Sequence, residues 1–210
     1  LGRFGAPTQE LTEADFSQLD SPGIDAYSKS KTLAERTAWD VAAQTGLGVV
    51  AIHPPYVFGP LLTRHSSASL LWLEKVLRRE VPGVANLYVP CVDVRDVALA
   101  HVRALSAQGV VGERFVVSGH EPHHADIARV LAQAYPRARL PFRRLPDFVV
   151  RLVGLFDPSV RLALPSLGLR LSFDTAKATR LLNFQPRPLA DTLLDTAASL
   201  EKHGLVSLRH

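Results

Sequence analysis

The 210-residue sequence contains no methionine and a single cysteine, Cys91. One thiol cannot form a disulfide within the chain, so a disulfide framework is excluded and a reducing compartment, the cytoplasm, is the expectation. No run of about 18 or more apolar residues occurs, so no membrane-spanning helix is predicted. Because methionine is missing and the sequence opens on LGRFGAPTQE, without a secretion-signal pattern, we expect the chain to be a fragment of a longer protein.

A glycine-rich phosphate-binding turn is also missing. Dinucleotide-binding folds place such a turn, GxGxxG, between the first strand and a helix whose amino terminus receives the pyrophosphate. Neither GxGxxG nor GxxGxxG occurs, and the pairs Gly46/Gly48 and Gly109/Gly112 follow helical patterns. By itself the chain is therefore expected to bind a dinucleotide poorly or not at all.

Charge of one sign is not concentrated either. The net charge is +4, from 24 basic and 20 acidic residues. The basic residues are spread over helical patterns, whereas nucleic-acid binding needs a focused patch, so no nucleic-acid partner is expected. The apolar share of 47% is that of a globular protein with a substantial core.

Periodicity predicts strands that alternate with helices. Apolar residues recur on one face of residues 26–45, with Gly46 as the stop, and GVVAIH at 48–53 is typical of a buried strand. Further strands are predicted near 88–94 and 114–118, further helices over 68–79, 95–107, 123–135, 146–156, 175–182 and 189–203, and a loop over 1–24. This alternation favours an α/β fold with a parallel sheet.

The stretch DAYSKSKTLAER contains a tyrosine four residues before a lysine, Tyr27 and Lys31. In a helix, positions i and i+4 lie on nearly the same face, one turn apart, whereas Lys29 points elsewhere. An ammonium close to a phenol favours the phenolate, which makes the phenol a usable general acid or base. The spacing alone also fits an ordinary exposed helical turn.

Five ordered blocks carry a resemblance: YSKSKTLAERTAWD, HPPYVFGPLL, VDVRDVALAHVRAL, ERFVVSG and SFDTAKATRLLNFQPRPLADTLLDTAASL. They resemble the extended short-chain dehydrogenase/reductase family (the NAD-dependent epimerase/dehydratase superfamily), in particular its dihydroflavonol-reductase-like branch. The resemblance runs from Tyr27 to about Leu200. It implies the C-terminal portion of a doubly wound Rossmann-type parallel sheet over residues 1–119, followed over 120–210 by a small, mostly helical substrate-side region and terminal helices.

The resemblance also implies roles for individual residues. Tyr27 matches the family's catalytic tyrosine, and Lys31 matches the lysine that lowers the tyrosine pKa and holds the nicotinamide ribose. Pro54 and Val57 match the segment beside the nicotinamide ring. The implied activity is reduction of an aldehyde or ketone by hydride transfer from NADP (or NAD), with a small-molecule carbonyl substrate and a homodimer as an allowed assembly. The family's catalytic serine would lie upstream of Leu1, and neither Ser17 nor Ser21 is assigned that role.

Other functions stay open. A sugar-nucleotide epimerase or dehydratase of the same fold would use the same pair and would need a diphosphate site, for which the arginines of RLPFRRLP (139–146) are candidates. A steroid dehydrogenase/isomerase, or a non-catalytic cofactor-sensing member, is also compatible. The apolar segment 146–171 indicates either a cap over an apolar or aromatic substrate or plain helix packing.

Three histidines cluster in GHEPHHAD: His120, His123 and His124, with Glu121 and Asp126 nearby. Their spacing fits no standard zinc pattern and includes no cysteine. A polar loop followed by a helix start is the better interpretation, so no metal site is predicted.

Overall fold

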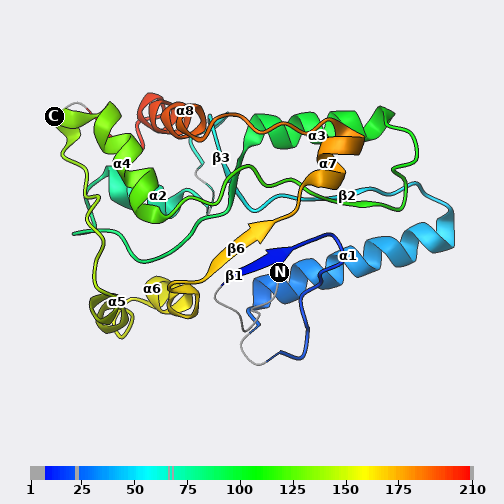
Figure 1. Ribbon diagram of the computed structural model, residues 1–210, viewed down its shortest axis with the longest axis horizontal. Coiled ribbons are helices and arrows are strands. Elements are labelled where there is room, and N and C mark those ends of the chain that lie inside the picture. Colours follow the sequence, from blue (N-terminus) through cyan, green and yellow to red (C-terminus); the bar gives the residue numbers. More distant parts are fainter. Residues whose placement is uncertain (1–7, 22–23, 66, 68, 209–210) are drawn as a thin grey trace.

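The computed structural model describes residues 8–21, 24–65, 67 and 69–208, in which strands alternate with helices (Figure 1). The strands are β1 (Thr8–Leu11), β2 (Ala51–His53), β3 (Tyr56–Phe58), β4 (Cys91–Asp93), β5 (Arg114–Val116) and β6 (Arg170–Phe173). The helices are α1 (Ala26–Thr45), α2 (Leu71–Leu77), α3 (Val94–Ser106), α4 (His124–Ala134), α5 (Asp147–Val153), α6 (Pro158–Ala163), α7 (Ala176–Leu182) and α8 (Leu189–Lys202), with 3₁₀ turns η1 (Pro136–Ala138) and η2 (Leu164–Ser166).

The six strands of the described residues form three parallel pairs: β1 with β6, β2 with β5, and β3 with β4. In the second pair Ala51 lies opposite Arg114 and His53 opposite Val116. In Figure 1, α3 lies on one side of β2 and α1 on the other. Parallel pairs joined through helices confirm the α/β prediction.

The two larger apolar clusters of the described residues hold these layers together. One joins α3 and α7 to β5 around Phe115, Ala100 and Leu182. The other joins α2, α4 and α8 around Phe58 and is completed by Leu73, Leu77, Ile127, Leu131, Leu193 and Leu200. Phe58 thus packs β3, the strand that follows Pro54 and Pro55, against helices α2, α4 and α8.

Several predicted elements differ from the observed ones. The loop prediction for 1–24 is wrong at Thr8–Leu11, because these residues pair with β6, more than 150 positions later in the chain. Strand β6, helix α6 and strand β3 were not predicted, and the strand predicted over 48–53 is shorter, Ala51–His53. Helix α1 has the predicted bounds.

Among the described residues, no helix is both long and apolar enough to cross a membrane.

Candidate active site

Helix α1 carries Tyr27 at the second residue of its first turn. Asp25 caps the helix: its carboxylate accepts hydrogen bonds from the Ser28 N–H at 2.8 Å and the Ser28 hydroxyl at 2.7 Å, and these bonds lower the pKa of Asp25. The helix ends at Gly46, whose φ of 72° is the left-handed conformation that glycine adopts readily. Tyr27 and Lys31 therefore lie one turn apart, as their spacing predicts.

Both side chains are open to solvent. Tyr27 is 73% exposed and Lys31 is exposed as well. Among the described residues, no side chain forms a hydrogen bond with the Tyr27 hydroxyl or an ion pair with the Lys31 ammonium. The two polar groups are thus available to an incoming ligand.

The second part of the site is the segment Pro54–Pro60, which follows β2 directly. Pro54 is exposed, whereas Val57 is half-buried in β3 and lies opposite Val92 of β4. The carboxyl ends of parallel strands are where open α/β sheets bind their ligands. The place of this segment matches the one that the sequence predicts for it.

Helix α8 fixes the end of that segment. The Gly59 N–H donates to the Thr196 hydroxyl at 2.7 Å, and the Leu61 N–H donates to the Ser199 hydroxyl at 2.8 Å. Gly59 has a φ of 118°, and a Cβ there would lie 2.9 Å from Cγ1 of Val94. Only glycine fits this turn, and the sequence carries no local signal for its partner on α8, which is 137 positions away.

A polar cluster joins α1 to the β2–β5 pair, and sequence reasoning missed it. The Glu35 carboxylate accepts two hydrogen bonds from the Arg114 guanidinium, and Nε2 of His53 lies 3.1 Å from Oε1 of Glu35 without hydrogen-bonding geometry. Burial raises the pKa of Glu35, but Arg114 and His53 outweigh it and hold that pKa below its usual value. Burial lowers the pKa of His53 in spite of Glu35.

The group Asp93, Arg95 and Asp96 fixes the start of α3. Asp93 caps the helix through the Arg95 N–H and accepts both ends of the Arg95 guanidinium, at 2.8 and 2.7 Å. Burial raises the pKa of Asp93, but these bonds outweigh it, so the net shift is downward. Asp96 pairs with Arg187. All of these carboxylates are bound by the protein's own side chains.

The three clustered histidines have separate partners. His120 contacts the Arg187 carbonyl oxygen at 2.7 Å, His123 caps α4 by accepting from the Ala125 N–H, and His124 is buried with its ring stacked 3.7 Å from Trp72. No group of three or more His, Cys, Asp or Glu that could hold a metal ion occurs in the described part of the chain.

The apolar segment 146–171 is exposed along one helix. In α5, Phe148 is 72% and Leu152 56% exposed, and Phe156 just beyond it is 82% exposed. Figure 1 shows α5 and α6 together at one end of β6, apart from α2, α4 and α8. Plain helix packing therefore does not account for these side chains.

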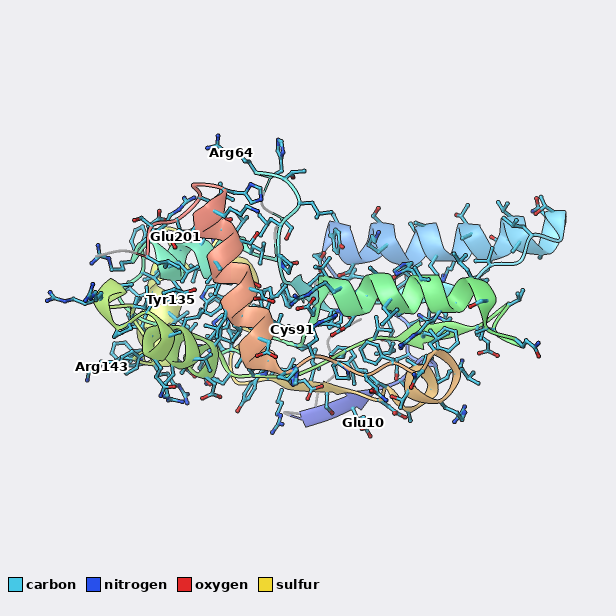
Figure 2. The ribbon with its side chains drawn as sticks, turned by 90° about the horizontal axis from the view of Figure 1, so that it is seen from above. Glu10, Arg64, Cys91, Tyr135, Arg143 and Glu201 are labelled. Atoms are coloured by element: carbon cyan, nitrogen blue, oxygen red, sulfur yellow. The ribbon has the colours of Figure 1, made fainter. Side chains whose placement is uncertain are left out.

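Arginines line a separate pocket of about 570 Å³, together with Pro136: Arg79, Arg137 and Arg139. None of these three guanidiniums pairs with a carboxylate elsewhere among the residues that the structure covers. In Figure 2, Tyr135, which precedes Pro136, lies at the end of the molecule away from α1. Arg139, one of the arginines that the sequence offers for a diphosphate site, lines this pocket, whereas Tyr27, Lys31, Pro54 and Val57 do not.

Comparisons with known sequences show the family to which the chain is similar. Residues 3–118 match the model of the NAD dependent epimerase/dehydratase family. Cinnamoyl-CoA reductase 1 of Arabidopsis thaliana is 36% identical over 137 residues, 64% of this chain and 40% of that protein. The NADPH-dependent methylglyoxal reductase of Saccharomyces cerevisiae is 28% identical over 201 residues, 90% of this chain and 54% of that protein.

Solved structures show the fold. Yeast methylglyoxal/isovaleraldehyde reductase complexed with NADPH matches with a TM-score of 0.72 and 24% identity, over 94% of this chain and 58% of that one. Vestitone reductase from alfalfa matches with a TM-score of 0.71 and 22% identity, over 94% and 60%. The likeness confirms a portion of a Rossmann-type α/β fold. The chain spans only 40% to 60% of the length of these four proteins.

Proposed function

The chain belongs to the NAD dependent epimerase/dehydratase family, and on that premise we propose that the protein reduces an aldehyde or ketone with NADPH or NADH, with Tyr27 as the proton donor. The observation that carries the proposal is the pair on α1: Tyr27 and Lys31 lie one helical turn apart, and both side chains are exposed and without a side-chain partner in the described residues. The relatives named as cinnamoyl-CoA and methylglyoxal reductases support carbonyl reduction.

In this proposal Tyr27 donates its proton to the carbonyl oxygen as that oxygen gains negative charge. The ammonium of Lys31 favours the tyrosinate left behind, which lowers the cost of the transfer. In the reverse direction Tyr27 takes the proton back. Lys29, two positions earlier on another face of α1, has no part in this step.

The residues of this chain fit one end of a nicotinamide cofactor, which would supply the hydride. The free Lys31 ammonium is a donor for ribose hydroxyls, and the exposed Pro54 and half-buried Val57 offer an apolar surface to the ring. A glycine-rich phosphate turn does not occur in these 210 residues, so the fit covers the nicotinamide end alone.

The exposed apolar side chains of α5, with Phe156 just beyond it, support an apolar or aromatic substrate. Phe148, Leu152 and Phe156 form a surface that would lose contact with water when covered by such a group. Small hydrophilic carbonyls would gain less from this surface. We therefore propose aryl or alkyl aldehydes and ketones as the substrate class.

The test is NADPH- and NADH-dependent reduction of a panel of aldehydes and ketones by the protein expressed from its complete coding sequence. Tyr27→Phe removes the proton donor, and the expected loss in kcat is about a hundredfold or more, the scale of general acid catalysis. Tyr135→Phe, at the far end of the molecule, is the matched control and is expected to retain activity. Equal kcat in Tyr27→Phe and wild type would overturn the proposal.

One observation favours a second candidate, a sugar-nucleotide epimerase or dehydratase. The pocket lined by Arg79, Arg137 and Arg139 offers three guanidiniums that pair with no carboxylate of the described residues, and such groups suit a diphosphate. Titration with a nucleoside diphosphate separates the two functions. Tight binding that Arg137→Ala abolishes supports the epimerase, and its absence supports the carbonyl reductase.

A further inference from the structure

Helix α1 is attached to the rest of the chain mainly by polar contacts. Thr32 is the one buried residue in its twenty-residue span. In Figure 1 the helix runs along one side of the molecule, and much of its length extends past β1 and β6. Apolar packing within this chain is therefore too sparse to fix the rotation and the position of the helix.

Glu35 makes the main polar contact, one helical turn after Lys31. Its Oε1 accepts from Nε of Arg114 at 2.6 Å and its Oε2 from Nη2 at 3.2 Å, and both side chains are only 14% exposed. Trp39, one turn further, donates from its indole nitrogen to the same carboxylate at 3.3 Å. A two-pronged arginine–carboxylate contact fixes orientation as well as distance.

Arg114 is itself held from several sides. Its guanidinium donates to the backbone carbonyl oxygens of Glu13 and Asp15 and lies 3.7 Å from the centre of the Phe16 ring. These contacts hold the guanidinium in place independently of its contact with Glu35. The arginine is therefore a rigid point on the sheet rather than a mobile surface side chain.

The cluster connects the two parts of the candidate active site. Arg114 opens β5 and lies opposite Ala51 of β2, and His53, beside Glu35, is the last residue of β2. Pro54 follows His53 directly. Glu35 thus joins the helix that carries Tyr27 to the strand that leads into Pro54 and Val57.

We infer that Glu35 is a positioning residue: through Arg114 and His53 it sets the place of α1 relative to the Pro54–Val57 segment, and hence the distance between the Tyr27 hydroxyl and a substrate held there. This inference rests on the proposed function. Tyr27 and Lys31 share one helix, so a shift of α1 leaves their mutual spacing intact. A positioning defect therefore lowers the rate without moving its pH dependence.

The test compares Glu35→Gln with wild type in the protein expressed from its complete coding sequence, at a temperature well below melting. Glutamine keeps the shape but loses the charge and one accepting oxygen. A misplacement on the order of 1 Å costs up to about a hundredfold, so kcat is expected to fall about tenfold to a hundredfold, with KM and the pH midpoint of kcat little changed. Asp126→Asn, which breaks the exposed Asp126–Arg129 pair on α4, is the control and is expected to leave kcat unchanged.

Each outcome decides the inference. Unchanged kcat in Glu35→Gln, with only a lower melting temperature and with Tyr27→Phe inactive, means that the cluster is merely structural and refutes positioning alone. Full activity in Tyr27→Phe refutes the proposed function and the positioning role together. If Glu35→Gln does not fold, Arg114→Lys, which keeps the charge and loses the fork, is expected to show the same fall in kcat, and normal kcat there refutes the inference.

Discussion

The hydroxyl of Thr196 is the support of the Pro54–Pro60 segment that is easiest to remove cleanly. Its side chain is fully buried, accepts from the Gly59 N–H at 2.7 Å and donates to the Thr192 carbonyl oxygen at 2.6 Å. Valine has nearly the same shape but no hydroxyl. Thr196→Val therefore leaves the buried Gly59 N–H without this acceptor.

The expected cost follows from that lost partner. A buried donor left without an acceptor costs about 1–3 kcal/mol. For a chain of this size, each kcal/mol lowers the melting temperature by about 2–4 °C, so Thr196→Val is expected to melt about 2–12 °C below wild type.

Thermal melting followed by circular dichroism measures this difference. Thr37→Val is the matched control: its hydroxyl also bonds a carbonyl oxygen four residues back, that of Leu33, but it lies exposed on α1. The control is expected to change stability by no more than about 0.5 kcal/mol. Equal melting temperatures for the two variants would show that the Gly59–Thr196 bond does not hold the segment.

Further predictions concern single buried positions. Gly59→Ala forces a Cβ to within 2.9 Å of Val94 at a φ of 118°, and a loss of about 1–3 kcal/mol is expected in urea unfolding; wild-type stability would contradict the close fit. Burial lowers the pKa of His124 to about 3, so the unfolded chain binds a proton that the folded chain does not, and stability falls as the pH drops below the ordinary value of 6.5. Between about pH 7 and pH 5 this loss is on the order of 2 kcal/mol, and His124→Phe, which keeps a ring against Trp72, is expected to remove it; equal acid sensitivity of the two proteins would contradict the argument. Burial raises the pKa of Cys91 to about 12, so a thiol reagent is expected to modify it only in denaturant, and rapid modification of the native protein would show that the site opens.

Local signals in the sequence predict the elements whose ends are set locally. Helix α1 has its cap, Asp25, and its stop, Gly46, within its own neighbourhood, so its bounds were correctly predicted. Strand β1 has no such signal, since its residues become a strand only by pairing with β6. Its formation depends on a contact that periodicity does not encode.

The candidate site likewise has a part that local sequence signals predict and a part that depends on long-range contacts. The Tyr27–Lys31 pair is readable because both residues lie on one helix, where spacing determines geometry. In the sequence, Glu35 has the pattern of a solvent-exposed charged residue on a helix. Its partner Arg114 is 79 positions away, so no local signal indicates the contact. A charged residue one turn beyond the Tyr27–Lys31 pair, followed by a tryptophan at the next turn, is the signal that could have drawn attention to this position.

The amino-acid composition alone does not predict the role of the exposed apolar side chains in and just after α5. The sequence around Phe148 and Phe156 fits either a substrate cap or helix packing, because an apolar helix face has the same residue pattern in both cases. In the structure both side chains are exposed, so packing within this chain does not account for them, and a role over a substrate stays a prediction.

The central claim, that the pair on α1 carries the chemistry, is tested most directly by two lysine variants of the protein expressed from its complete coding sequence. Lys31→Met and Lys29→Met remove the same charge from the same exposed helix, two positions apart. The account predicts that Lys31→Met loses NADPH-dependent carbonyl reduction while Lys29→Met retains it. Equal activity of the two variants would contradict the account.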